Sequence, residues 1–355
     1  MIGGGLISVG GYGCIYYPEL KTKSKKNISK VQIKDSFVVK NEILISKILK
    51  KIKAYSDYFG VVEKKQSINI KKIPNKKDCT AIKEEKNDTF TLMTIPYIGK
   101  QNYQEYLLKQ TDNKNAFLYF IETYKRLLNA IILLTEQKIV HFDLKDNNIM
   151  FNDVKKIPIL IDFGLSIPLS NIKNNMKKYF YIYAPQYLYW PLEVHYLNYL
   201  LHVSEEPTKD ALKKMAKIFV KKNFILQKTM SKKFLKEFEN YCLLMLEHYS
   251  KTSVEGITKY ILSKANTWDN YSLSTLFLKY LKFFNKDGFV KNNFTIHFSK
   301  LLLENIHPNP EKRNKVLDTF NKFDKLFYDE KISNAANFTE ILENILKTKK
   351  EMTKE

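Results

Sequence analysis

Four polar residues of complementary chemistry stand close together in residues 141–164, HFDLKDNNIMFNDVKKIPILIDFG. They are two acids, one cation and one amide: Asp143, Asp162, Lys145 and Asn148. Polar groups flank two short apolar runs, IMF and IPILI, which predict a pair of strands, so the four side chains are expected on loops at strand ends. This set suits phosphoryl transfer, which needs one group to orient a hydroxyl and oxygen ligands that hold Mg²⁺ against phosphate.

These residues resemble two loops of the protein kinases, the catalytic loop H-R-D-L-K-x-x-N and the metal-binding loop D-F-G. The step of 19 residues from Asp143 to Asp162 also matches the family, and Phe142 departs from it by standing in place of arginine. The resemblance implies an α+β, bilobal fold with a small β-rich N-lobe and a larger helical C-lobe. It implies that Asp143 orients the substrate hydroxyl and that Lys145 neutralises charge on the transferring group. It also implies that Asn148 and Asp162 hold Mg²⁺.

Residues 6–17, LISVGGYGCIYY, predict two strands joined by a glycine turn. Glycine in such a turn lets backbone N–H groups approach phosphate, because no Cβ stands in the way. The stretch is similar to the nucleotide-covering loop of the kinases. The similarity implies that ATP is bound at Ser8, Gly10, Gly11 and Gly13.

The next two elements are expected to hold the phosphates of ATP. Residues 27–33 alternate as a strand that contains Lys30, and Glu42 follows twelve residues later in a helical pattern. The resemblance implies that Lys30 pairs with Glu42, so that its ammonium holds the α- and β-phosphates. One turn beyond Glu42, Ser46 stands where the family usually packs an apolar residue.

A buried strand is predicted over residues 89–98, TFTLMTIPYI, and Pro96 ends it. The run resembles the strand and hinge that join the two lobes of a kinase. The resemblance implies that Ile95 faces the adenine pocket. It implies that Pro96, Tyr97 and Ile98 form the hinge, whose backbone groups recognise adenine.

Three later features follow the same family pattern. Apolar residues recur at helical spacing over 114–136 and predict a long buried helix. Asp269 opens a stretch that resembles the central C-lobe helix, where the aspartate braces the catalytic-loop backbone. Arg313, one of only two arginines, is expected to pair with the glutamate that ends the activation segment. Two stretches compete for that end, APQ at 184–186 and PLE at 191–193, and the second is preferred because only it supplies a glutamate.

The resemblance implies three parts: an N-lobe over 1–98, a C-lobe over 99–320, and a C-terminal helix with a charged tail over 321–355. Residues 205–266 exceed what the family needs, and their apolar spacing predicts an inserted pair of helices. Ten lysines between residues 209 and 236 make one helical face basic. We interpret this face as solvated, and a docking surface for an acidic partner is the alternative.

Composition bears on the setting of the protein. The formal net charge of +22 comes almost entirely from lysine, as expected from an AT-rich genome, and it leaves nucleic acid open as a partner. No apolar run approaches the roughly 20 residues of a membrane span. Cys14, Cys79 and Cys242 show neither disulfide nor metal-ligand spacing, which favours a reducing compartment. The sequence texture is similar to that of kinases of large cytoplasmic DNA viruses, which implies a cytoplasmic location, in the host cell or in the virion.

The expected activity is that of a serine/threonine protein kinase, which transfers the γ-phosphoryl of ATP to protein hydroxyls, because Lys145 is the serine/threonine pattern. Two other classes stay open. A pseudokinase would use the fold as a binding scaffold, and a small-molecule kinase acting on aminoglycosides or choline would share the H-x-D-x-x-x-x-N loop. With Phe142 in place of arginine, we expect the activation segment to be held by aromatic packing of residues 179–183 rather than by a phosphate on Ser166 or Ser170.

Overall fold

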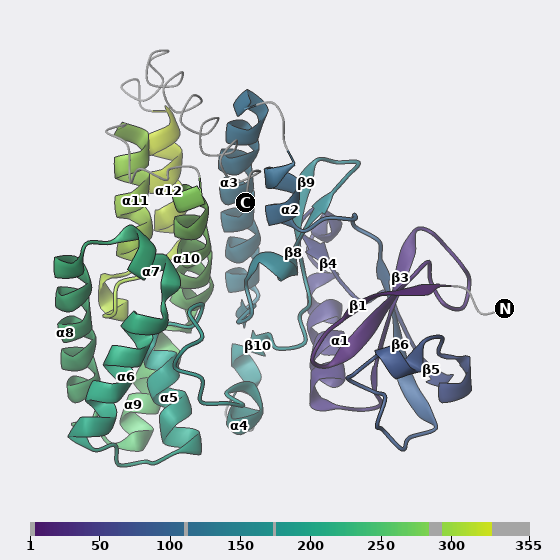
Figure 1. Ribbon diagram of the computed structural model, residues 1–355, viewed down its shortest axis with the longest axis horizontal. Helices are drawn as coiled ribbons and strands as arrows, with labels where there is room; N and C mark the ends of the chain where they lie inside the picture. Colours follow the sequence, from purple (N-terminus) through teal and green to yellow (C-terminus); the bar gives the residue numbers. More distant parts are fainter. Residues whose placement is uncertain (1–3, 110–112, 173–174, 284–292, 329–355) are drawn as a thin grey trace. The chain divides into compact units, whose positions relative to one another are not determined.

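The structure is a computed structural model, and it describes residues 4–109, 113–172, 175–283 and 293–328. The fold is mixed α+β, with an N-terminal antiparallel sheet followed mostly by helices (Figure 1). The chain forms two compact units, which we describe separately. The first unit comprises residues 1–103 and 147–168, and the second comprises residues 104–146 and 169–355. The lobe boundaries expected at residues 98 and 320 stay a prediction, and the charged tail beyond residue 328 lies outside the described residues.

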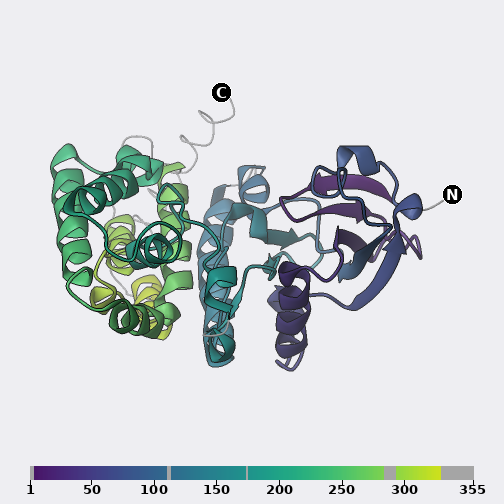
Figure 2. The same ribbon diagram turned by 90° about the horizontal axis from the view of Figure 1, so that it is seen from below.

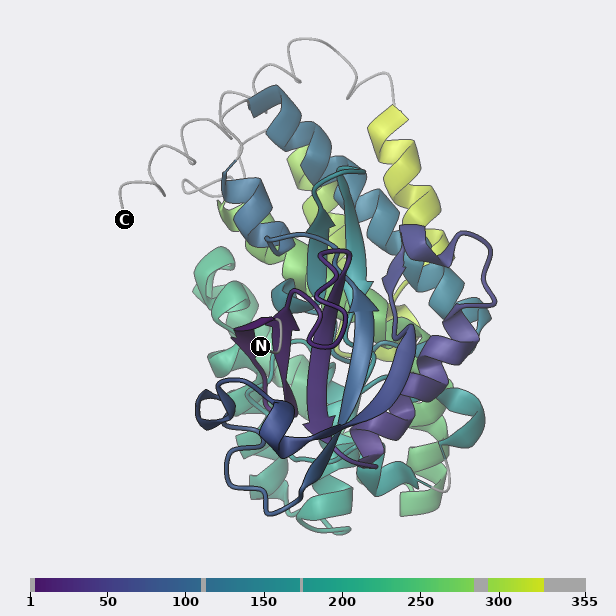
Figure 3. The same cartoon turned by 90° about the vertical axis from the view of Figure 1, so that its right-hand side faces the viewer.

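The first unit is built around a five-stranded antiparallel sheet (Figure 3). Its strand order is β1 (Gly5–Val9), β2 (Gly13–Tyr17), β3 (Asn27–Ile33), β6 (Thr89–Pro96), β5 (Lys64–Asn69). Alternate side chains of neighbouring strands form a shared core on one face of this sheet. Its members include Cys14, Tyr16, Val31, Phe90 and Leu92. The strand–turn–strand expected at the N-terminus and the two later strands are confirmed.

Helix α1 (Phe37–Leu49) follows β3 and starts at a side-chain cap, where the Ser36 hydroxyl accepts a hydrogen bond from the Val39 N–H at 3.3 Å. The helix carries three buried polar residues, Asn41, Glu42 and Ser46. The Ser46 hydroxyl accepts a hydrogen bond from the backbone N–H of Val62 at 3.1 Å. A polar side chain is therefore accommodated at the position where the family usually has an apolar one.

A second, three-stranded sheet belongs to the same unit. Its order is β4 (Phe59–Gly60), β9 (Ile157–Ile161), β8 (Ile149–Asn152). Strands β8 and β9 pair antiparallel, so the strand pair predicted from the IMF and IPILI runs is confirmed. Strand β8 begins directly after Asn148, and strand β9 ends directly before Asp162.

Two of the three cysteines form a disulfide. Cys14 of β2 is bonded to Cys79, with their Cα atoms 5.9 Å apart, and both side chains are fully buried. Cys242 is free and buried. The expectation of unpaired cysteines is therefore wrong for Cys14 and Cys79. The two residues lie 65 positions apart, and the fold of the 70–82 segment against the sheet brings them together, which sequence spacing does not reveal. Cysteine usage thus gives no support to a reducing compartment.

The second unit is mainly helical (Figure 2). Its main helices are α2 (Tyr103–Leu108), α3 (Asn113–Glu136), α5 (Leu192–His202), α6 (Lys209–Lys222), α7 (Phe224–Thr229), α8 (Lys232–Tyr249), α9 (Val254–Ser263), α10 (Trp268–Phe283), α11 (Asn293–Asn305) and α12 (Val316–Tyr328). The long helix expected over 114–136 is α3. Tyr124 of α3 lies at the centre of an aromatic core, with ring centroids 4.7 Å from Phe277 of α10, 4.9 Å from Phe298 of α11 and 4.7 Å from Phe323 of α12.

Residues 205–266 form four helices, α6 to α9, rather than the predicted pair. Helices α6 and α8 pack side by side and are the two that the apolar spacing indicated. The ten lysines of 209–236 are all exposed, which agrees both with a solvated face and with a docking surface. None of the described helices has the length and apolar character that crossing a bilayer requires.

Candidate active site

Lys30 is held by two carboxylates in the interior of the first unit. Its ammonium lies 3.0 and 2.8 Å from the two carboxylate oxygens of Glu42 and 2.9 Å from Oδ1 of Asp162. Lys30 and Glu42 are buried, at 7% and 3% exposure. Burial alone lowers the pKa of Lys30, but the Asp162 and Glu42 carboxylates outweigh it and raise this pKa above its ordinary value. The pair expected between strand and helix is present, and Asp162 of the D-F-G motif joins it.

The loop that carries Asp162 is fixed by packing and by one side chain that sequence reasoning missed. Asp162 has a φ of +64°, an unusual backbone conformation for a residue with a side chain. The Asn41 amide donates hydrogen bonds to the carbonyl oxygens of Gly164 at 2.9 Å and Ser166 at 2.7 Å. Gly164 leaves no room for a Cβ, which would lie 2.6 Å from Val38. Asn41 and Glu42 are neighbours on α1, so one turn of this helix orients both Lys30 and the loop.

The first unit also supplies the two expected Mg²⁺ ligands. Asn148 ends a short 3₁₀ helix, η4 (Asp146–Asn148), and is 5% exposed, whereas the Asp162 side chain is 45% exposed. A carboxylate and an amide oxygen are the hard ligands that Mg²⁺ prefers. The donor set therefore fits the ion. Among the described residues, no group of three or more His, Cys, Asp or Glu side chains is arranged to hold a metal ion.

The glycine turn expected to cover nucleotide phosphates connects β1 to β2. The Gly10 N–H donates a hydrogen bond to the Gly13 carbonyl at 2.9 Å, and Ser8, Gly10 and Gly11 are exposed. Gly13 differs from the others because it is buried against β3. A Cβ there would lie 2.4 Å from the Gln32 side chain and 2.5 Å from the Val31 carbonyl. The sheet itself therefore requires glycine at position 13.

The expected hinge begins at Pro96, the last residue of β6, and Ile95 lies within that strand. Ile95 is buried with Val62 and Met93 in a small apolar cluster. The Tyr97 ring stacks on Tyr17 at a centroid distance of 4.3 Å. The Tyr97 backbone N–H donates a hydrogen bond to the Lys26 carbonyl at 2.9 Å. This N–H is already used within the unit, while the roles expected for Ile95, Pro96 and Ile98 towards adenine stay predictions.

Asp143 and Lys145 lie together in the second unit. The Lys145 ammonium donates to both carboxylate oxygens of Asp143, at 2.9 and 2.8 Å. Tyr187, which the sequence did not single out, donates a hydrogen bond from its hydroxyl to Asp143 Oδ1 at 2.7 Å. The base expected at position 143 is thus surrounded by a cation and a hydroxyl.

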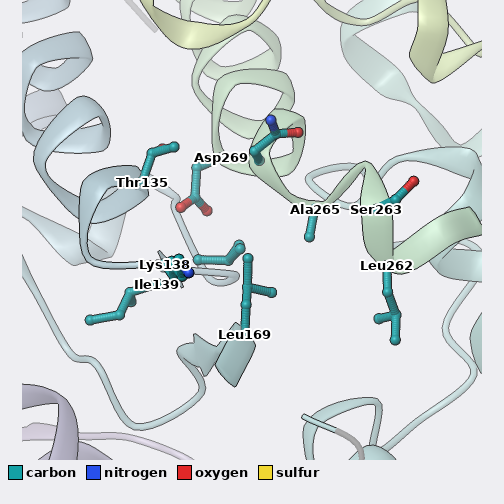
Figure 4. Close-up of a pocket in the computed structure, with 10 residues that line it drawn as sticks. Thr135, Lys138, Ile139, Leu169, Leu262, Ser263, Ala265 and Asp269 are labelled. Carbon is teal, nitrogen blue, oxygen red and sulfur yellow. The ribbon is translucent and has the colours of Figure 1, made fainter. Parts of the chain in front are cut away.

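The backbone before Asp143 is braced by Asp269, as expected. The Asp269 carboxylate accepts hydrogen bonds from the N–H groups of His141 at 2.6 Å and Phe142 at 3.0 Å. Burial raises the pKa of Asp269, and the charge of His141 and these N–H donors oppose the shift. A cavity of about 280 Å³ adjoins this aspartate, between the ends of α3 and α9 and the start of α10 (Figure 4). Lys138 and Leu262 belong to its wall.

Phe142 occupies the position where the family has arginine, and it lies in an aromatic cluster. Its ring stacks on Trp190 at 4.9 Å and contacts Phe180 at 5.6 Å and Trp268 at 5.8 Å, all as centroid distances. Phe142 is 2% exposed and has a φ of +67°. The Trp190 indole N–H donates to the Phe142 carbonyl at 2.8 Å. Packing therefore joins the expected catalytic loop to Phe180 and Trp190 of the same unit.

Glu193 pairs with Arg313, as the preference for the 191–193 stretch predicted. The guanidinium donates two hydrogen bonds of 2.7 Å, one to each carboxylate oxygen. Gln186, in the competing stretch, is exposed. The preferred stretch, 191–193, is confirmed as the one whose acid meets the arginine.

Asp146 is a further acid of the expected catalytic loop, and sequence reasoning missed its contacts. Its carboxylate accepts hydrogen bonds from the Lys279 ammonium at 2.6 Å and from the Tyr280 hydroxyl, both on α10. The Tyr189 hydroxyl adds a third, at 3.3 Å. The sequence indicated these contacts only weakly, because the partners of Asp146 lie more than 40 positions away and no local pattern links them to it.

The candidate residues fall into two groups, one in each unit. Lys30, Glu42 and Asp162 meet in the first unit, which also holds Asn148 and the glycine turn. Asp143 and Lys145 meet in the second. The chain matches no model of a known protein family and no curated protein.

Proposed function

We propose that the chain is a serine/threonine protein kinase that transfers the γ-phosphoryl group of ATP to protein hydroxyls with the aid of Mg²⁺. The observation that carries the proposal is the buried Lys30 ammonium held by Glu42 and Asp162. A lysine fixed in this way presents a positive charge that needs little reorganisation when phosphate arrives. The motif spacing supplies the rest of the argument, because it places Asp143 and Asn148 where the kinase family has them.

Each residue then has a separate task. Lys30 holds the α- and β-phosphates, and Asp143 orients the acceptor hydroxyl and takes its proton. Lys145 offsets negative charge on the transferring group. Asn148 and Asp162 would hold Mg²⁺, which when bound neutralises charge on the phosphate oxygens. Positioning and electrostatic stabilisation account for nearly all of this chemistry.

A direct test offers two kinds of acceptor to the purified protein. Labelled ATP with Mg²⁺ is incubated with casein and a basic protein in one set, and with a panel of amino-alcohols in the other. We expect label on serine and threonine of the proteins, and none in a matched sample of Asp143→Asn. Transfer to amino-alcohols alone identifies a small-molecule kinase. Tight ATP binding without transfer to any acceptor identifies a pseudokinase, and either result refutes the proposal.

A further inference from the structure

The Tyr187 hydroxyl contacts the proposed base, and the kinase motifs do not account for this contact. It donates to Asp143 Oδ1 at 2.7 Å, the same oxygen that accepts a hydrogen bond from Lys145 at 2.9 Å. Hydrogen bonds to a carboxylate are about twice as strong as those between neutral groups, and they fix its orientation. Two donors of different kinds therefore set the rotation of this carboxylate.

Tyr187 is itself held firmly. Its ring packs on Trp190 at 4.8 Å and on Tyr189 at 5.8 Å between centroids. The ring nitrogen Nε2 of His195 lies 3.1 Å from the carbonyl oxygens of both Tyr187 and Trp190. His195 is fully buried, and burial lowers its pKa to about 4 against the opposing effect of these carbonyls. A neutral imidazole with its proton on Nε2 satisfies the contacts, so the backbone at both ends of 187–190 is anchored at physiological pH.

The same four-residue segment contacts the catalytic loop at three points. The Tyr187 hydroxyl reaches Asp143, the Tyr189 hydroxyl reaches Asp146, and the Trp190 indole reaches the Phe142 carbonyl. Every one of these contacts is a hydrogen bond donated by an aromatic side chain. Burial raises the pKa of Tyr187, and the Asp143 charge raises it further, so this hydroxyl keeps its proton and acts as a donor.

We propose that Tyr187 is a positioning residue for Asp143, and that its hydroxyl keeps the carboxylate aimed for the acceptor hydroxyl. The inference rests on the proposed kinase activity. A carboxylate already fixed when the acceptor binds needs no reorganisation in the transition state. The alternative is that the Tyr187 hydroxyl occupies the position of the acceptor hydroxyl and so blocks binding of the acceptor. In that case, removal of its hydroxyl accelerates the reaction.

The test compares Tyr187→Phe with Tyr55→Phe. The control removes the same atom from a tyrosine of the first unit, whose hydroxyl donates to Glu63 at 3.0 Å and not to Asp143. We expect Tyr187→Phe to lower kcat about 10- to 100-fold, as for one hydrogen bond to a charged group. The KM values for ATP and for the protein acceptor should stay within about twofold. A structural role alone would change the melting temperature without this split between kcat and KM.

Rates are measured about 10 °C below the lower of the melting temperatures of the two variants, so that loss of folded protein cannot mimic loss of turnover. Tyr55→Phe should keep wild-type kinetics. An active wild type whose kcat is unchanged or raised in Tyr187→Phe overturns this inference and leaves the kinase proposal standing. An inactive wild type overturns both proposals.

Discussion

Arg313 donates two parallel hydrogen bonds to Glu193, each 2.7 Å long, and both side chains are completely buried. The Trp268 indole N–H adds a third donor to Glu193, at 3.1 Å. The ion pair between Arg313 and Glu193 joins the start of α5 to the short 3₁₀ helix η8 (Pro310–Lys312), which immediately precedes Arg313. Since α5 begins directly after the 187–190 segment, the ion pair also fixes the chain that positions Tyr187.

Removal of one member of this pair should destabilise the second unit. Arg313→Met and Glu193→Gln should each lower the free energy of unfolding by about 3–5 kcal/mol, because the remaining charge is buried without its partner. The double variant should lose less than the sum of the two. The exposed neighbour Lys312 supplies the control Lys312→Met, which should change stability little. Denaturant titration checks these values, and additive losses in the double variant would contradict the coupling.

Catalysis should depend on Lys30 and Asp143 for different reasons. Asp143→Asn should reduce phosphotransfer by roughly 10²–10⁴-fold, the usual contribution of a positioned acid–base group, with little change in melting temperature. Lys30→Met should abolish transfer and also lower the melting temperature, since two carboxylates then meet without a cation. Paired kinetic and melting measurements separate the two effects. Wild-type turnover in purified Asp143→Asn would refute the mechanism.

Nucleotide binding should be detectable without turnover. ATP with Mg²⁺ should raise the melting temperature, since a ligand that binds only the folded state stabilises it. Asp162→Ala should weaken the part of this shift that EDTA removes. If EDTA leaves the wild-type shift unchanged, the proposed Mg²⁺ ligands do not act on the nucleotide.

Activity should not require a phosphate on the activation segment. Phe142 cannot bind phosphate, and its ring is packed against Phe180, Trp190 and Trp268. The Ser166 side chain is fully buried, so a phosphate could not be added there in the folded state. The dephosphorylated protein, verified by mass spectrometry, should show full initial rates, and so should a variant of the exposed Ser170, Ser170→Ala. A lag that ends with autophosphorylation would contradict this expectation.

The Cys14–Cys79 disulfide should stabilise the first unit. A cross-link between residues 65 positions apart reduces the conformational freedom of the unfolded chain, with a chain-entropy contribution of about 4 kcal/mol. Dithiothreitol should lower the melting temperature of the wild type. Cys14→Ser should have that lower melting temperature without dithiothreitol, and dithiothreitol should not lower it further. If dithiothreitol lowers the melting temperature of Cys14→Ser as much as that of the wild type, the disulfide is not the cause of the change.

Local patterns predicted much of this protein because their causes are local. The pairing of β8 with β9 follows from two apolar runs and a short turn. The pairing of Lys30 with Glu42 was expected from the resemblance to the kinases, and the local strand and helix patterns supported it. The Glu193–Arg313 pair spans 120 residues, and it was expected from the same resemblance, supported by the rarity of arginine in this chain.

The missed features depend on three-dimensional packing. Asn41 holds a loop more than 120 residues away, and Tyr187 reaches Asp143 from 44 residues away. Neither residue type is distinctive in a chain rich in asparagine and tyrosine. The disulfide was missed for the same reason, since the pairing of two cysteines depends on the course of the intervening chain.

The contrast among the turn glycines bears on how this chain can change over evolutionary time. Gly13 is required by its contacts with Gln32 and Val31, so selection for folding alone preserves it. Gly11 has nothing within 4 Å of where a Cβ would lie, and for Gly10 the one neighbour is at 3.6 Å. Sequence drift in descendants that had lost catalysis would therefore reach positions 10 and 11 first and leave position 13 untouched. Under the proposed function, glycine at positions 10 and 11 would be kept by selection for nucleotide binding, whereas glycine at position 13 is explained by folding alone.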